Sequence, residues 1–117
     1  MLSVPDGAPP NVTARNLSST EILVEWEPLP TKHVHGVLLS YQMNLTKDKK
    51  NFTKVINVPP NVTNYHVTGL EKYTHYVISL AAVNEVGVGI SSDDVTVWTE
   101  EDGKLHFIFI VNSRHVK

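Results

Sequence analysis

The fold is decided by Gly69-Leu70-Glu71-Lys72-Tyr73-Thr74-His75-Tyr76 together with the stretch that follows it directly, Val77-Ile78-Ser79-Leu80-Ala81-Ala82-Val83-Asn84. From Tyr76 onward, apolar residues recur at every second position, which is the pattern of a strand with one buried face. Leu70 precedes Tyr76 by six residues. This layout is typical of a tyrosine corner, in which the phenol hydrogen-bonds to the backbone of the preceding connection. We therefore expect a β-sandwich.

Similar alternating stretches recur along the chain, separated by turns that contain proline, glycine, asparagine and serine. No long window has apolar residues at the three- and four-residue spacing of a helix. The chain is thus expected to be all-β, with seven short strands at residues 11–16, 21–27, 37–46, 51–58, 65–70, 76–84 and 95–99. Seven strands at this spacing suit two packed sheets.

One face of each predicted strand is apolar and should form the core. Trp26 and Tyr41 are large members of that core, and we expect them to pack near each other. The residues predicted to point inward are Ile22, Val24, Trp26, Val37, Leu39, Tyr41, Met43, Tyr65, Val67, Leu70, Tyr76, Ile78, Leu80, Ala82, Val95 and Val97. Leu23, Leu38 and Trp98 fall on the outward faces.

Length and composition restrict the class of protein. A chain of 117 residues is enough for one sandwich and too short for two. Its formal net charge of -2 gives no global field that would attract nucleic acid or anionic lipid. The absence of cysteine excludes disulfides, thiolate nucleophiles and zinc–thiolate sites. The core must therefore be held by packing alone.

The chain resembles fibronectin type III domains over about Pro5 to Glu101. The residues that carry the resemblance are the prolines at 9 and 10, Trp26, Tyr41, Leu70, Tyr76, Ala82, Asn84, Gly87 and Gly89. The resemblance implies an immunoglobulin-like sandwich of seven strands. It also implies a module of a cell-surface protein, in a style similar to neural adhesion proteins and receptor-type tyrosine phosphatases.

Two departures from the family pattern affect these expectations. Many members have Pro-Gly before the threonine of the corner, whereas this chain has Lys72-Tyr73. We expect an intact corner, because Leu70 and Tyr76 are both present. The loop 84–92 contains no arginine. Integrin binding through an Arg-Gly-Asp sequence in that loop is therefore excluded.

The prolines near the start and the loss of the pattern near the end predict three segments. Residues 1–7 read as a stiff inter-domain linker, residues 8–101 as the module, and residues 102–117 as a C-terminal tail of uncertain origin. The tail carries an apolar run, 105–111, that is much shorter than the roughly 20 residues a membrane-spanning helix needs. The linker implies a larger modular protein.

Five Asn-X-Ser/Thr sequons predict an extracellular glycoprotein, secreted or part of a single-pass membrane protein. The alternative is that asparagine and threonine are simply common in turns and at strand ends. The candidate glycosylation sites are Asn11, Asn16, Asn44, Asn51 and Asn61.

Candidate catalytic and metal-binding groups are sparse. His33 and His35 lie in a predicted loop without a third ligand nearby, and an ordinary exposed loop is the simpler interpretation. Thr74, His75 and Ser79 alternate between strand faces, and no carboxylate orients the histidine. Acidic residues at 85, 93–94 and 100–102 lack the spacing of a calcium loop. We expect no enzyme activity, no cofactor and no metal.

The favoured function is protein–protein interaction and domain spacing, without contact to nucleic acid or, by this domain, to the membrane. Partners are expected to be other cell-surface or matrix proteins and neighbouring modules, bound at loops 28–36 and 84–92 on one end of the sandwich. The candidate interaction residues are His33, His35, Glu85, Val86, Val88 and Trp98. Two alternatives stay open: a heparin-like glycan site at the lysine turn 47–54, and a purely structural spacer.

Overall fold

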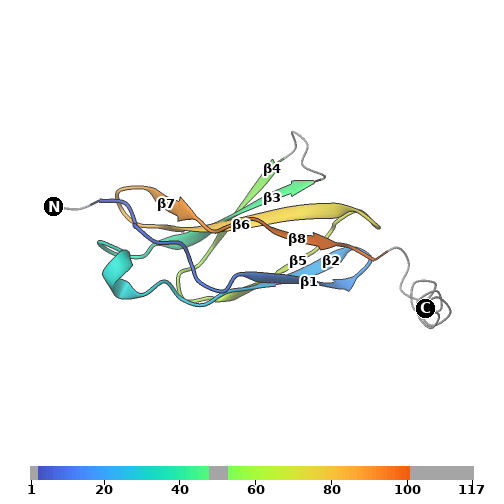
Figure 1. Cartoon of the computed structure of the whole chain (residues 1–117), viewed down its shortest axis with the longest axis horizontal. Helices are drawn as coiled ribbons and strands as arrows, with labels where there is room; N and C mark the ends of the chain where they lie inside the picture. Colours follow the sequence, from blue (N-terminus) through green and yellow to red (C-terminus); the bar gives the residue numbers. More distant parts are fainter. Residues whose placement is uncertain (1–2, 48–52, 101–117) are drawn as a thin grey trace.

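The protein is a sandwich of two antiparallel sheets (Figure 1), seen in a computed structural model that describes residues 3–47 and 53–100. A single turn of 3-10 helix, η1, spans Thr31–His33. The strands are β1 (Thr13–Ser18), β2 (Glu21–Glu25), β3 (Ser40–Lys47), β4 (Thr53–Val58), β5 (Asn64–Val67), β6 (His75–Val83), β7 (Val88–Ser91) and β8 (Val95–Trp98). The prediction of an all-β sandwich is confirmed.

The smaller sheet has the order β1-β2-β5, and the larger has the order β4-β3-β6-β7, with β8 also paired to β6. Directly opposed residues in an antiparallel pair share a face, so register decides what is buried. In the larger sheet Tyr41 lies opposite both Val58 and Ala82, and all three are buried. In the smaller sheet Ile22 lies opposite Val67, and both are buried.

The two inner faces meet in one apolar core. Trp26 packs edge-on against Tyr41, with ring centroids 5.6 Å apart and an interplanar angle of 65°. This is a favourable aromatic geometry and places the two rings as the sequence predicted. The buried hydrophobic residues of the core cluster are Ile22, Val24, Trp26, Leu29, Val34, Tyr41, Met43, Leu45, Val58, Val67, Tyr76, Ile78, Leu80, Ala82 and Val97. Tyr65 and Leu70 are partly buried and pack against them.

The prediction that Val37 and Leu39 point inward is wrong. Their exposed fractions are 61% and 51%, whereas Leu38, expected outward, is half-buried against the core. The sheet ladder starts only at Ser40. The preceding residues are held instead by two separate hydrogen bonds, from the Val37 N–H to the Glu85 side chain in the turn after β6 and from the Leu39 N–H to the carbonyl of Val83, the last residue of β6. Strand alternation therefore does not extend back to residue 37.

The strand count is also corrected: residues 3–47 and 53–100 contain eight strands, where seven were expected for the chain. Residues 84–92 were expected to be a loop, but they contain β7, which pairs with β6 through Ala81–Ser91 and Val83–Val88. Glycines at 87 and 89 weaken the alternating pattern there, and β7 is only four residues long. The first strand starts at Thr13 and not at 11, because Asn11 has a φ of 55° and precedes the ladder. Residue 51 and the tail 102–117 lie outside the described residues.

The tyrosine corner is present at the end of the sandwich where the described chain finishes. The phenol oxygen of Tyr76 accepts a hydrogen bond from the Glu71 N–H at 2.9 Å. Beside it, the Thr99 hydroxyl donates to the Glu71 carbonyl at 2.7 Å and accepts from the Thr74 N–H at 2.9 Å. The corner is therefore hydrogen-bonded to Thr99, the residue that follows β8.

Candidate functional site

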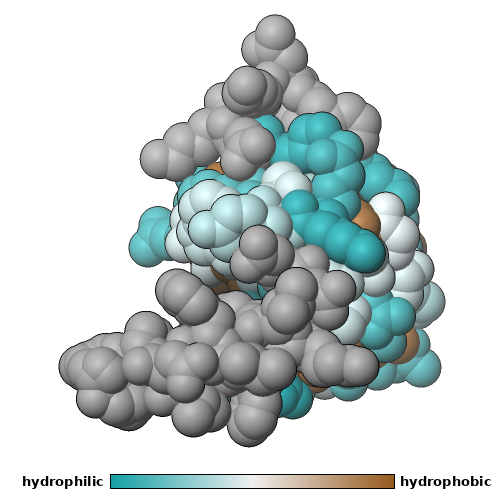
Figure 2. All heavy atoms as spheres, turned by 90° about the vertical axis from the view of Figure 1, so that its right-hand side faces the viewer, coloured by the Kyte–Doolittle hydropathy of each residue, from teal (hydrophilic) through white to brown (hydrophobic). Residues whose placement is uncertain are grey.

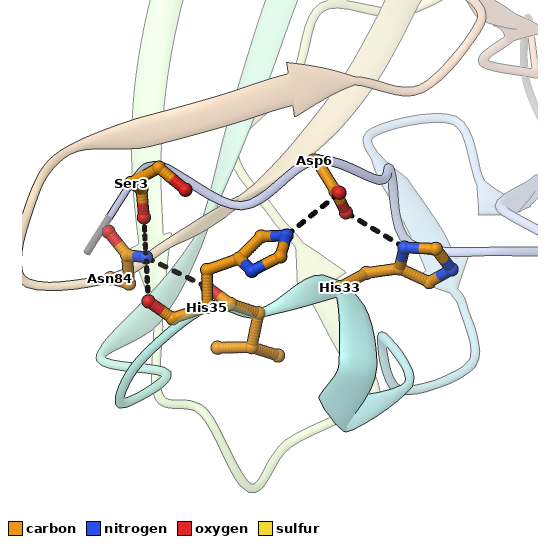
Figure 3. A network of polar contacts seen from close by, with 6 residues as sticks. Ser3, Asp6, His33, His35 and Asn84 are labelled. Carbon is orange, nitrogen blue, oxygen red and sulfur yellow. Dashed lines mark hydrogen bonds and ion pairs between the residues drawn. The ribbon is translucent and has the colours of Figure 1, made fainter. Parts of the chain in front are cut away.

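Two loops and the entering chain meet at one end of the sandwich, and Asn84 joins them (Figure 3). This side chain is 2% exposed. Its Nδ2 donates to the carbonyls of Ser3 at 2.7 Å and Val34 at 2.8 Å. Its Oδ1 accepts from the Val86 N–H at 2.9 Å, which closes the turn that follows β6. One amide therefore connects three segments that are remote in sequence.

Asp6 binds both histidines of the loop that contains η1. Its Oδ1 lies 2.8 Å from His33 Nδ1, and its Oδ2 lies 2.8 Å from His35 Nε2 (Figure 3). The Asp6 N–H also donates to the His33 carbonyl at 2.9 Å. The bonds from His35 and then His33 hold the pKa of the Asp6 carboxyl below its ordinary value. His33 and His35 thus fix the entering segment.

Glycine permits the closest approach between that segment and β7. Pro5 is buried, and a Cβ placed on Gly89 would lie 2.6 Å from the Pro5 carbonyl oxygen and 2.7 Å from its Cβ. No side chain fits at those distances without a shift of the backbone. Residues 3–7, expected as a linker, therefore lie packed against the loops.

The same loops expose apolar side chains to solvent. Val86 and Val88 are 50% and 44% exposed, and Glu85, the residue before Val86, accepts a hydrogen bond from the Val37 N–H at 2.8 Å. Hydrogen bonds from the backbone N–H of Glu85 itself and from Val37 lower the pKa of the Glu85 carboxyl. We refer to the exposed residues Val37, Leu39, Val86, Val88 and Ile90 as the valine surface.

Trp98 lies away from this end, on the outward face of β8, with an exposed fraction of 51%. Its ring centroid is 5.4 Å from that of Tyr73 and 5.1 Å from that of His75. Tyr73 is 62% exposed. Viewed from the right-hand side of Figure 1, the described surface is mostly hydrophilic with scattered hydrophobic spots (Figure 2).

The sequons stand in different environments. Asn11 and Asn61 are exposed near turns, and Asn44 is half-buried in the middle of β3. Asn16 is exposed on β1, and its Nδ2 donates to the Trp98 carbonyl at 2.8 Å. Asn51 lies outside the described residues.

No arrangement for metal or acid–base chemistry stands out. Within residues 3–47 and 53–100, no three His, Cys, Asp or Glu side chains are grouped to hold a metal ion. The Thr74 hydroxyl donates to the Lys72 carbonyl, and His75 lies against Trp98 rather than beside a serine. At the lysine turn, Lys47 forms an ion pair with Glu71 at 2.8 Å.

Sequence reasoning missed several of these partners. Asp6 was placed in a linker, and nothing in its local sequence signals two histidines that lie 27 and 29 positions later. Tyr73 and His75 were assigned no role, although the outward position of Trp98 was expected. The family resemblance includes Gly89, but the sequence does not explain why glycine is required there. The tertiary structure supplies the reason, which is the close approach of Pro5.

Comparison with known families decides the class. The model of the Fibronectin type III domain matches residues 7–98. The chain belongs to this family. The resemblance drawn from the corner, Trp26 and the glycines is thereby confirmed.

Curated relatives of this fibronectin type III chain are much longer proteins. It is 37% identical over 100 residues to Phosphatidylinositol phosphatase PTPRQ of Rattus norvegicus, covering 86% of this chain and 4% of that protein. It is 33% identical to Protogenin of Rattus norvegicus, covering 78% and 7%, and 33% identical to Netrin receptor DCC of Rattus norvegicus, covering 99% and 8%. The chain therefore spans less than a tenth of each relative.

Solved structures agree on the fold. The third fibronectin III domain of human KIAA0343 superposes with a TM-score of 0.77 at 31% identity, covering 84% of this chain and 85% of that chain. The fn3 domain of human contactin 1 gives 0.75 at 27% identity, covering 86% of each. Among the described residues of this fibronectin type III chain, no helix has the length and apolar character to span a membrane.

Proposed function

We propose that this module is a non-catalytic, extracellular part of a larger cell-surface adhesion protein or receptor, in which it binds protein partners and spaces neighbouring modules. The observation that carries the proposal is the valine surface: five large apolar side chains, 44% to 61% exposed, on segments tied together by Asn84 and Glu85. Exposed apolar side chains on loops and on an edge strand favour protein contact.

Because His33 and His35 bind Asp6, we expect partner contacts at this end of the sandwich to be made by other residues. His33 Nδ1 and His35 Nε2 are used by Asp6, so they fix the loop rather than offer those atoms to a partner. Val86 and Val88 have no such internal role for their side chains and remain the preferred contact residues. A loop held by several hydrogen bonds also loses less conformational entropy on binding.

Binding tests this proposal. The glycosylated protein from mammalian cells is applied to a panel of cell-surface ectodomains, with a Val86→Ser/Val88→Ser variant in parallel. The matched control is Val55→Ser, because Val55 is 50% exposed but lies on β4, at the opposite edge of the larger sheet. We expect the double variant to weaken a hit at least about tenfold and the control to leave it unchanged. Equal loss in both, or no hit at micromolar concentration, contradicts the recognition role.

The spacing role is supported by the docking of residues 3–7. A segment bound by Asn84, Asp6 and the Gly89–Pro5 contact would fix the direction from which an upstream module enters. Gly89→Ala should release it, whereas Gly87→Ala is the control, since its new Cβ would meet Val4 only at 3.4 Å. We expect hydrogen-exchange protection of the Asp6 amide to be lost in the first variant and kept in the second. An unprotected Asp6 amide in the unmodified protein removes this support.

The lysine turn remains the alternative glycan site. Of its lysines, Lys47 is paired with Glu71 and Lys54 is exposed. Salt-sensitive retention on heparin that falls in Lys54→Gln, but not in Lys32→Gln on η1, would favour this alternative.

A further inference from the structure

The sequon at Asn16 has its glycan-accepting atom held against the backbone of an exposed aromatic residue, Trp98. Asn16 Nδ2 donates to the carbonyl of Trp98 at 2.8 Å. A second contact fixes the same two segments, since the Glu100 N–H donates to the Ser18 carbonyl at 3.4 Å. The end of β1 therefore runs along the edge of β8 that is not paired with β6 (Figure 1).

Three side chains form the neighbouring platform: Tyr73, His75 and Trp98. Trp98 lies between the other two, opposite His75 across the β6–β8 pair and 5.4 Å from Tyr73. Trp98 and Tyr73 leave more than half of their surface exposed, at 51% and 62%. Exposed aromatic area of this size is costly in water and favours an occupant with apolar C–H groups and polar edges.

We propose that Asn16 carries an N-linked glycan whose first N-acetylglucosamine packs on the platform of Trp98 and Tyr73. A pyranose ring matches these requirements, because its C–H groups form an apolar face that stacks on aromatic rings while its hydroxyls stay in water. The proposal rests on the extracellular location proposed above. It assigns the platform an occupant within the same molecule.

The chemistry of the linkage is compatible with the contact. During transfer from a lipid diphosphate-linked oligosaccharide, Asn16 Nδ2 bonds to the anomeric carbon, the bond from that carbon to the diphosphate breaks, and Nδ2 loses one proton. The second Nδ2 hydrogen remains and continues to donate to the Trp98 carbonyl. That bond fixes the orientation of the Asn16 side chain beside β8, so the attached sugar leaves Nδ2 at a defined angle to the Trp98 carbonyl.

The aromatic ring contacts of the described residues are Trp26 with Tyr41 in the core and the pairs made by Trp98. Asn61 is exposed in a turn after two prolines, and serves as an internal reference for passage through the secretory pathway.

The experiment compares Ser18→Thr, which keeps the sequon, with Ser18→Ala, which abolishes it and leaves Asn16 in place. Both full chains are made in mammalian cells, and peptide mass spectrometry measures occupancy at Asn16 and Asn61. Acrylamide quenching of tryptophan fluorescence then reports on Trp98, because Trp26 is only 5% exposed. We expect Trp98 quenching to fall at least about twofold in the glycosylated protein, since stacking covers ring surface that is otherwise exposed. Trimming to a single N-acetylglucosamine should retain the shielding.

Each other outcome overturns the inference in a recognisable way. Occupied Asn16 with equal quenching in the two proteins excludes stacking. Asn61 occupied with Asn16 empty excludes the glycan at this position but leaves the extracellular proposal standing. No occupied sequon overturns both. A thermal-stability cycle gives a second readout: the rise in Tm from the Asn16 glycan should disappear in Trp98→Ala, and its survival there contradicts the platform.

Discussion

The phenol oxygen of Tyr76 accepts a hydrogen bond from the backbone N–H of Glu71 at 2.9 Å. The bond joins the start of β6 to the connection that precedes it, in a corner where Lys72-Tyr73 replaces the usual Pro-Gly. The polar network of Thr74 and Thr99 surrounds the same peptide. The family substitution at 72–73 therefore leaves the corner intact.

Tyr76→Phe should lower the free energy of unfolding by about 1 to 2 kcal/mol, because the partly buried Glu71 N–H loses its acceptor. The control is Tyr65→Phe, since Tyr65 is also a half-buried strand tyrosine and its hydroxyl has no hydrogen bond within the described part of the chain. Urea unfolding measures both. A Tyr76→Phe midpoint equal to that of the control would contradict a stabilising corner.

Trp26→Ala should cost about 3 to 5 kcal/mol through the cavity left beside Tyr41. Trp26→Phe should cost much less, because a phenyl ring still fills part of the space. In addition, the buried Nε1 of Trp26 has no hydrogen-bond partner among the described atoms, so its removal breaks no hydrogen bond. Thermal unfolding followed by circular dichroism distinguishes the two. An unchanged melt for the alanine variant would remove Trp26 from the core.

Asn84→Ala should lower stability by roughly 2 kcal/mol or more, because the buried Val34 carbonyl and the part-buried Val86 N–H lose their partners together. Asn84→Asp keeps the shape but turns Nδ2, a donor, into an oxygen that faces the carbonyls of Ser3 and Val34. We expect the aspartate variant to be at least as destabilised at neutral pH. Near-wild-type unfolding of Asn84→Asp would show that the amide donors contribute little.

Asp6→Asn should have an effect that depends on pH. The folded-state pKa of Asp6 is depressed by His35 and His33. Its contribution is therefore present above the ordinary carboxyl pKa, near 3.8, and is lost as the pH falls through the lower folded value. We expect the difference in Tm between wild type and Asp6→Asn to be present above about pH 4 and to shrink as the pH falls below it. A difference independent of pH down to pH 2 would exclude the carboxylate as its source.

Much of the fold was available from local sequence. The alternation in β2 and β6 predicted the burial of Ile22, Val24, Ile78 and Leu80, because a period of two on a half-buried strand specifies which face points inward. The same rule failed at Val37 and Leu39, where the chain has left the sheet and follows a loop from β6. It also missed β7, whose glycines remove the side chains that make a pattern visible.

The sequence by itself determined the class of protein, the core and the corner, since these depend on residues whose spacing repeats along one strand or one turn. Only the tertiary structure decided what the loops and the entering segment do. Asp6 meets His33 and His35, Gly89 meets Pro5, and Asn16 meets Trp98 because two sheets and their connections fold onto one another. Such contacts join residues that are up to 84 positions apart and obey no periodicity, so no local pattern encodes them.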